Sequence, residues 1–146
     1  MSALSITASQ VIPSSQASLR VVKLGAACTA GQPLYKNSDV YNLAGAENTA
    51  SAVVAGIACT SGSTGQSIVM CVSDPEFTLG SSALAANKVG QHYLLHTTEG
   101  LIVPISDLFS GVSSYYHCSI GTCVAVGKIA FDFSTPNVPF FGYSVA

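Results

Sequence analysis

The chain has 146 residues, which suits one domain with a sizeable core, and it carries only seven acidic and five basic side chains. Charged residues make up 8% of the chain, against about 25% in an average soluble domain. The scattered basic residues argue against binding to nucleic acid, and no apolar run approaches the ~18 residues of a membrane span. Because interface cores are depleted of charge, we expect much of the surface to contact other protein subunits; a neutral surface rich in serine and threonine is the alternative.

We expect residues 1–20 to form an extended N-terminal arm outside the folded body. The segment is rich in serine, has no charge before Arg20 and is interrupted by Pro13. Its apolar side chains exceed what a solvated tail needs, and strand pairing with a neighbouring subunit would explain them; a disordered tail is the alternative. The candidate contact residues of this arm are Leu4, Ile6, Val11 and Ile12. The N-terminus lacks the pattern of a secretory signal, so we expect the protein to remain in the cell that makes it.

Residues 21–146 are expected to form a single β-domain, and its first strand is expected to begin at Leu19. Strands are predicted at residues 19–24, 34–35, 40–43, 50–59, 67–73 and 76–79. Turn-forming residues separate these runs, and the loop at 60–65 (TSGSTG) is the clearest of them. Residues 81–88 (SSALAANK) are the one candidate for a turn or two of helix, with a serine cap and a terminal lysine.

The central feature of the domain is a predicted hairpin, with strands at residues 91–96 and 101–105 joined across Gly100. A glycine followed by glutamine leads into an apolar extended run here and at two earlier places in the chain. The three pairs are Gly31-Gln32, Gly65-Gln66 and Gly90-Gln91. The repeated pair indicates the same kind of turn before each strand.

The C-terminal part is predicted to contain a short helical turn at 106–109 and two strands at 115–120 and 123–133, on either side of Gly121. A strongly apolar tail with Phe140, Phe141 and Tyr143 follows. Strand signals at this spacing, with little helix, indicate an all-β fold: one compact β-barrel or β-sandwich.

Candidate catalytic and metal sites are few. His92 and His96 are four residues apart, but on a strand they lie about 13 Å apart, too far to share one ion. His117 and Cys118 with Cys123 are a better metal set, yet no second pair with matching spacing exists, and core thiols are the preferred interpretation. The chain has no G-x-S-x-G motif and no phosphate-binding loop. We therefore expect no enzyme activity, no cofactor, no metal and no small-molecule substrate.

Five cysteines are an odd number in a chain without a secretory signal, so they cannot all pair within one chain. Free cysteine is commonly buried and behaves as a small apolar side chain, and cytosolic thiols stay reduced. We expect buried, reduced thiols at Cys28, Cys59, Cys71, Cys118 and Cys123.

A succession of short motifs resembles the head-decoration, or capsid cement, proteins of tailed bacteriophages. The resemblance covers about residues 21–133, in the right order and spacing, and its specificity comes from that order. The motifs are LG at 24–25, AGQPLY at 30–35, VAGIA at 54–58, GQ at 65–66, VGQ at 89–91, TEGLIVP at 98–104 and VGKIA at 126–130.

The resemblance implies a trimer on the outer surface of the virion, assembled in the bacterial cytoplasm, that clamps the major capsid protein lattice of the head. The family offers no catalytic residues or cofactors, and its N-terminal segment often reaches onto the capsid or a neighbour. This chain departs from the family in its number of cysteines and in its longer aromatic tail. Whether Phe140, Phe141 and Tyr143 contact the other copies of the trimer or fold back on the core is left open. The alternative function is a receptor- or carbohydrate-binding β-module of a phage tail or cell surface.

Overall fold

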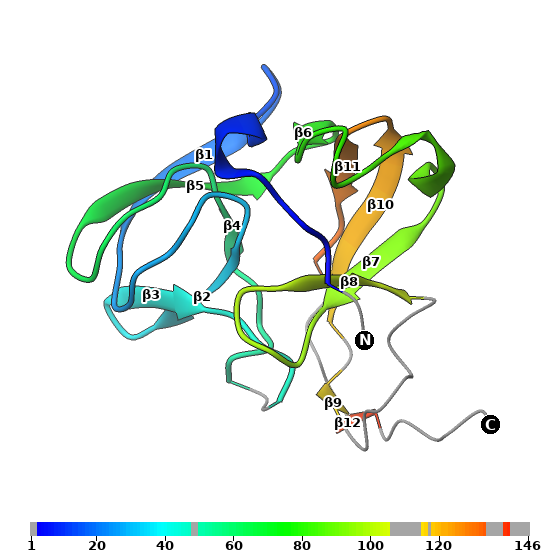
Figure 1. Cartoon of the computed structure of the whole chain (residues 1–146). Coiled ribbons are helices and arrows are strands. Elements are labelled where there is room, and N and C mark those ends of the chain that lie inside the picture. The colour runs from blue at the N-terminus through cyan, green and yellow to red at the C-terminus, as the bar shows by residue number, and fades with distance from the viewer. Residues whose placement is uncertain (1–2, 48–49, 106–114, 117, 134–138, 141–146) are drawn as a thin grey trace.

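The fold is all-β: two five-stranded antiparallel sheets pack together as a sandwich (Figure 1). The computed structural model describes residues 3–47, 50–105, 115–116, 118–133 and 139–140, of which 115–116 and 139–140 are described by their backbone alone. The compact sandwich predicted from strand spacing is therefore confirmed. Helix within the described residues is limited to two 3-10 turns, η1 (Ala8–Gln10) and η2 (Ala86–Lys88), and to Ile105, which is also in 3-10 conformation.

The first sheet has the strand order β1-β5-β4-β2-β3. Its strands are β1 (Ser18–Lys23), β2 (Pro33–Asn37), β3 (Val40–Leu43), β4 (Gly56–Ala58) and β5 (Ser67–Ser73). The sheet curls so strongly that its outer strands meet at one point, where Gly25 donates a 2.9 Å backbone hydrogen bond to Tyr41. Its concave face encloses a small core of its own, to which each of the five strands contributes. That core contains Val22, Leu24, Cys28, Leu34, Tyr41, Ala58, Ile68 and Met70.

The second sheet has the strand order β6-β11-β10-β7-β8. Its strands are β6 (Phe77–Thr78), β7 (His92–Leu95), β8 (Ile102–Pro104), β10 (Ser119–Ala125) and β11 (Lys128–Phe131). Strands β7 and β8 are the predicted central hairpin, closed by a hydrogen bond from His96 to Leu101. A separate two-stranded sheet pairs β9 (Tyr115–Tyr116) with β12 (Pro139–Phe140).

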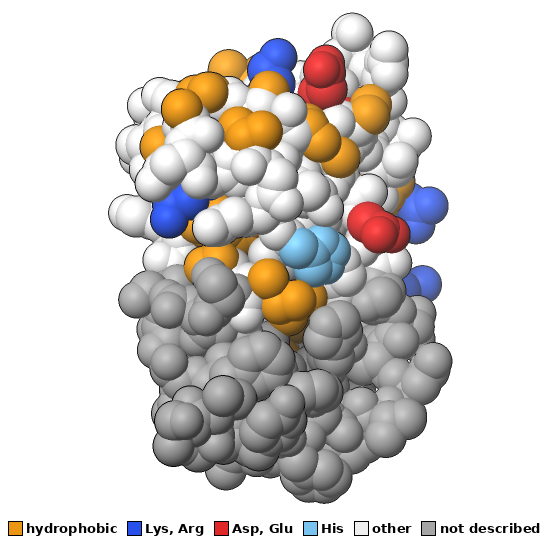
Figure 2. All heavy atoms as spheres, turned by 90° about the vertical axis from the view of Figure 1, so that its right-hand side faces the viewer, with side chains coloured by type: hydrophobic (Ala, Val, Ile, Leu, Met, Phe, Trp, Pro, Cys, Tyr) orange, Lys and Arg blue, Asp and Glu red, His pale blue; other side chains and the backbone are white. Residues whose placement is uncertain are grey.

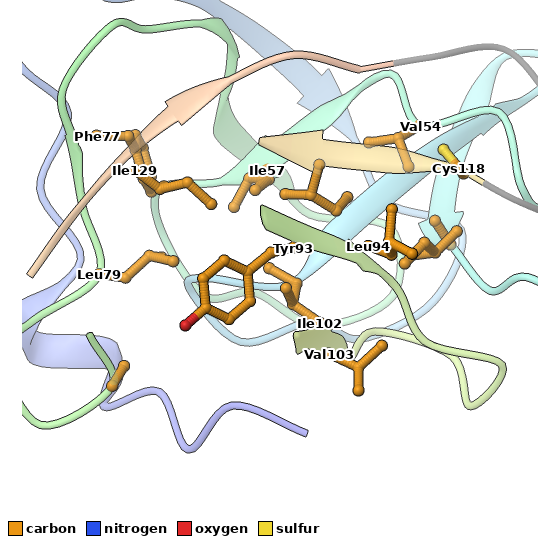
Figure 3. Packing of buried hydrophobic residues seen from close by; sticks show 14 of the residues in the cluster. Val54, Ile57, Phe77, Leu79, Tyr93, Leu94, Ile102, Val103, Cys118 and Ile129 are labelled. Carbon is orange, nitrogen blue, oxygen red and sulfur yellow. The ribbon is translucent and has the colours of Figure 1, made fainter. Parts of the chain in front are cut away.

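The main core lies between the two sheets (Figure 3). Ile57 from the first sheet faces Tyr93, Ile129 and their neighbours from the second, and all three side chains are fully buried. Burying a large apolar side chain contributes about 1.5–3 kcal/mol, so this shared core is the main attraction between the sheets.

The three glycine–glutamine pairs form the same turn. Each glycine has a positive φ, of 95°, 87° and 93° in chain order, which glycine adopts without steric cost. Each glutamine N–H donates to the carbonyl three residues before it, as in a type II turn. In the first two turns the glutamine Oε1 also accepts a 2.8 Å bond from the backbone N–H of that same residue, Thr29 or Ser63. The predicted turn is confirmed at each of the three positions.

Three local predictions are wrong, each because a tertiary contact overrides local preference. The first half of the strand expected at 50–59 is a turn, in which Ser51 and Gly45 exchange hydrogen bonds, and only β4 is extended. The helix expected at 81–88 is reduced to η2, and no side chain caps its first turn. Gly121 is not in a turn: it lies inside β10, and the turn is at Gly127, whose φ is 76°.

Gly121 is needed for the close approach of strands β10 and β11. A Cβ atom at this position would overlap the carbonyl oxygen of Ala130 on the neighbouring strand. The pairing of β10 with β7 also changes register between Ser119 and Gly121, as at a β-bulge. The helical turn expected at 106–109 lies outside the described residues.

Candidate interaction surface

The N-terminal segment, residues 3–17, crosses the second sheet from one edge strand to the other. At one end Leu4 donates a 2.8 Å backbone hydrogen bond to Ile102 in β8. At the other end Ile12 and Thr78 of β6 exchange two backbone hydrogen bonds of 3.0 Å. In Figure 1 the segment is the dark blue chain that runs from η1 toward β8. Both edges of the second sheet thus gain a partner from the same segment.

The apolar side chains of this segment pack against the main core of the same chain. Val11 is buried, and Leu4, Ile6 and Ala8 are half-buried against the core, alternating with exposed residues as in a strand. Ile6 lies directly over Gly31, where an added Cβ atom would come within 2.7 Å of its Cγ2 atom. A glycine at 31 therefore leaves space for Ile6.

A buried aspartate fixes the end of the segment. The side chain of Asp74 is 2% exposed and accepts hydrogen bonds from the backbone N–H and the hydroxyl of Ser14. It also accepts a 2.9 Å bond from the backbone N–H of Glu76. Since buried donors are costly to leave unpaired, these bonds hold the segment to the turn between β5 and β6.

The path of the segment corrects the picture of a free arm. Residues 3–17 lie on the body, and β1 begins at Ser18, so the expected boundary after residue 20 falls inside a strand. Of the four candidate contact residues only Ile12 is exposed, at 58%; Leu4, Ile6 and Val11 face the chain's own core. The segment binds its own body because the edges of the second sheet offer the backbone partners that a neighbour was expected to supply. Contact with a neighbouring subunit stays a prediction.

Several large aliphatic side chains are exposed among the described residues. They are Ile12, Leu19, Val21, Val53, Val89, Ile105, Val124 and Val126. On the described part of the face shown in Figure 2, hydrophobic side chains lie between uncharged ones, with individual Lys or Arg and Asp or Glu groups among them. A surface of this kind is easily desolvated, as the centre of a protein interface must be.

Three of these exposed side chains gather at the end of the second sheet that holds the β10–β11 turn. Gly90 donates a 2.7 Å backbone bond to Cys123, which places Val89 beside Val124. Val126 belongs to the turn itself. We name Val89, Val124 and Val126 the valine patch.

A groove of about 320 Å³ runs beside the first residues of the N-terminal segment. Leu4 and Ile6 form one wall, and the turn at Gly31-Gln32 together with Leu101 forms the other. Its lining is partly polar and contains no charged side chain. The groove therefore offers space but no group that would select a charged ligand.

A serine, a histidine and a threonine form a hydrogen-bonded chain across β7 and β10. The Oγ atom of Ser119 lies 2.9 Å from Nε2 of His92, and Nδ1 of His92 lies 3.2 Å from Oγ1 of Thr122. A serine nucleophile needs a base oriented by a third group, which in the common triad is a carboxylate that stabilises the imidazolium. Here a neutral hydroxyl holds that position, and Ser119 is 6% exposed. The three side chains thus link two strands without the charge that the triad chemistry uses.

All five cysteines are free thiols. Cys59 directly follows β4, and Cys71 lies in the neighbouring strand β5. Burial raises the pKa of Cys59 to about 12 and that of Cys71 to about 11. A protonated thiol is a poor nucleophile and a poor metal ligand. Within the described ranges no three His, Cys, Asp or Glu side chains are placed to bind a metal ion.

The remaining sequence candidates are dispersed. His96 is 8% exposed and accepts a 2.8 Å bond at Nδ1 from the N–H of Thr98, in the turn between β7 and β8. Cys118 and Cys123 lie in the main core, whereas His117 is outside the described residues. Phe140 is in β12, paired with Tyr115, and Phe141 and Tyr143 also lie outside the described residues. No helix in the described part of the chain is long and apolar enough to span a membrane.

Comparisons with known proteins identify no relative. No protein-family model matches the chain, and no curated protein sequence matches it. Sequence reasoning missed the valine patch because Val89 and Val124 are distant along the chain, and only the strand pairing brings them together.

Proposed function

We propose that this protein is a structural virion protein: a trimeric decoration protein that binds the outer surface of a phage head and stabilises its major capsid protein lattice. The observation that carries the proposal is the charge-poor surface with exposed aliphatic side chains, since such a surface is unusual for a domain that remains alone in solution. The order of the motifs between residues 21 and 133, which resembles that of phage head-decoration proteins, supports a phage head as the proposed partner.

The valine patch is the proposed contact between copies of the chain. Its three side chains are between 44% and 49% exposed. They come from the turn after η2, from strand β10 and from the β10–β11 turn. Small aliphatic groups on a rigid scaffold can be buried at little entropic cost. The exposed part of the N-terminal segment is the proposed contact with the capsid. The aromatic tail is a further proposed contact with the other copies of the trimer.

The receptor-binding alternative gains no support from a specific observation. Sugar and small-ligand sites are commonly lined by aromatic side chains. Among the side chains that the structure describes, those of Phe and Tyr are buried or half-buried, and the exposed large ones are aliphatic.

The mass of the purified, reduced protein tests the trimer. Light scattering on a sizing column should give three times 14.9 kDa, about 45 kDa. Replacing Val124 and Val126 by lysine should shift the mass to that of a monomer, whereas Val53→Lys, an exposed valine outside the patch, should leave it unchanged. If the protein is a monomer at all concentrations in solution and also when it is bound to phage heads, the proposed trimer is wrong.

Co-sedimentation with expanded phage heads that lack their decoration protein tests the partner. We expect saturable binding to a matching head and a higher temperature of head disruption. Deleting residues 1–9, which leaves the Ile12 and Ser14 contacts intact, should weaken binding without unfolding the domain. If no head in a panel of tailed phages binds the protein, and a glycan array does, the receptor-binding alternative replaces this one.

A further inference from the structure

Strand β1 has a free backbone edge. It pairs with β5 on one side, and at its C-terminal end Leu24 bonds to Gln66 on the β5 side while Gly25 bonds to Tyr41 on the opposite side. The backbone groups of a strand point alternately to its two sides. Leu19, Val21 and Lys23 therefore direct their N–H and C=O groups away from β5, and in the part of the chain that the structure describes no strand covers them.

The side chains along this edge are unusually apolar for an open strand. Leu19 is 51% exposed and Val21 71% exposed, the highest value among the large apolar side chains described. Leu19 lies opposite Cys71 of β5, which is fully buried in the main core. The exposed side chains of Leu19 and Val21 therefore lie next to that core. Natural sheets normally protect such edges with charges, prolines or a covering segment. Strand β1 has the charges of Arg20 and Lys23, but no described strand covers Leu19 or Val21.

The charges on the strands of the first sheet are all positive. The strands of the first sheet contain Arg20, Lys23 and Lys36 and no acidic residue. Arg20 and Lys23 are exposed, and neither forms an ion pair with another described residue. At the other end of β1, beyond the pairing of Ser18 with Ser73, the nearest exposed charge is that of Glu76.

We propose that the β1 edge, Ser18–Lys23, is a docking site for an extended, acidic segment of another protein. The segment adds a strand next to β1 through the backbone groups of Leu19, Val21 and Lys23. Leu19, Val21 and Lys23 lie on one face of β1 and Arg20 on the other, since side chains alternate along a strand. Two apolar side chains of the segment cover Leu19 and Val21, an acidic side chain on the same face lies beside Lys23, and another on the opposite face lies beside Arg20. Backbone bonds give such a complex its affinity, and the charges set its direction and register. This inference does not depend on binding to a phage head.

Two synthetic peptides test the proposal: acetyl-Glu-Thr-Val-Glu-Val-amide, which in an antiparallel pairing places its residues opposite Lys23 to Leu19 in turn, and the same peptide with lysine in place of glutamate. At low salt the acidic peptide should bind the reduced protein and slow hydrogen exchange at the amides of Leu19, Val21 and Lys23. The basic peptide should not bind. Raising the salt concentration should weaken the binding of the acidic peptide, because the pairs are exposed.

Variants assign the binding to this edge. The double substitution Arg20→Glu with Lys23→Glu should weaken binding of the acidic peptide by more than about tenfold and favour the basic peptide. Lys36→Glu, an exposed lysine on β2, is the matched control and should change little. Thermal melting should show that all three proteins are folded.

Three results would overturn the inference. One is protection at amides outside β1, and another is equal affinity for both peptides. The third is a change in the oligomeric mass on Val21→Lys, which would show that a second copy of the chain covers this edge. If the protein does not bind phage heads but binds the acidic peptide, the proposed function is wrong and this inference is unaffected.

Discussion

The two sheets differ in how their edges are treated. In the second sheet both edge strands are bonded to the N-terminal segment, through Leu4 at β8 and Ile12 at β6. In the first sheet the edges meet at Leu24 and Tyr41, and no other strand among the described residues pairs with the outer side of β1. Because an uncovered edge is a ready site for strand addition, a protein normally protects both sheets alike. In the second sheet the chain covers its own edges, whereas the edge of β1 is the proposed docking site.

The cores support the same distinction. The second sheet packs its buried side chains into the core that both sheets share. The first sheet has in addition a core of its own inside its curl, so its shape does not depend on the second sheet alone. A strand that binds a partner gains from such support, because a rigid edge loses little conformational entropy on binding.

The largest effect is expected on removing the anchor of the N-terminal segment. Asp74→Ala leaves the donors of Ser14 and Glu76 without their acceptor and should lower the free energy of unfolding by about 3 kcal/mol. It would also free the segment from β6 and leave the second sheet with an open edge. Chemical denaturation measures the change. Asp39→Ala, at an exposed turn, is the control, and equal stabilities of the two variants would refute the role of this anchor.

A smaller effect is expected where two strands of the second sheet approach most closely. Gly121→Ala would place a methyl group against the carbonyl of Ala130 and should cost about 2 kcal/mol. Gly65→Ala, before β5 in the first sheet, meets open space and suffers only from its positive φ of 87°, so about 1 kcal/mol is expected. Thermal unfolding of both variants measures the difference. The reverse order would contradict the assignment of Gly121 to a strand interior.

The N-terminal segment itself should contribute less. Ile6→Ala removes part of a half-buried side chain that packs over Gly31 and should cost about 1 kcal/mol. Ile12→Ala alters an exposed side chain, so a change within about 0.5 kcal/mol is expected. Equal losses would show that the two side chains are equally buried in solution, contrary to the structure.

The smallest effect concerns pH. Burial lowers the pKa of His96 below its ordinary value of 6.5, so the folded protein takes up this proton less readily than the unfolded chain. The stability that the neutral ring provides is fully present above pH 6.5 and is lost as the pH falls through the folded pKa. His96→Asn keeps an acceptor for the N–H of Thr98 and should flatten this part of the stability profile. An unchanged profile between pH 7 and about 5 would refute the assignment.

Local signals in the sequence were sufficient for most strands and for the three glycine–glutamine turns. Alternating apolar residues predicted β1, and the run at 67–73 matches β5 residue for residue. A glycine with positive φ before each glutamine needs no distant partner, since the turn forms from four consecutive residues. For the same reason the all-β class and the hairpin of β7 and β8 could be predicted from the sequence.

The sequence could not determine features that depend on which strands meet. Gly121 has the same local signature as a turn glycine, and only the approach of Ala130 shows that it lies inside β10. The valine patch likewise exists because Gly90 pairs with Cys123. Contacts between distant residues have no local pattern from which to predict them.

The sequence by itself determined an all-β domain with little charge, because strand periodicity and composition are local properties. The tertiary structure decided where its apolar segments go: Val11 enters the chain's own core, while Val21 is left on an open edge. Both side chains look alike in the sequence, as valines in extended runs. They differ because the N-terminal segment reaches and covers the edges of the second sheet, whereas no described strand pairs with the outer side of β1.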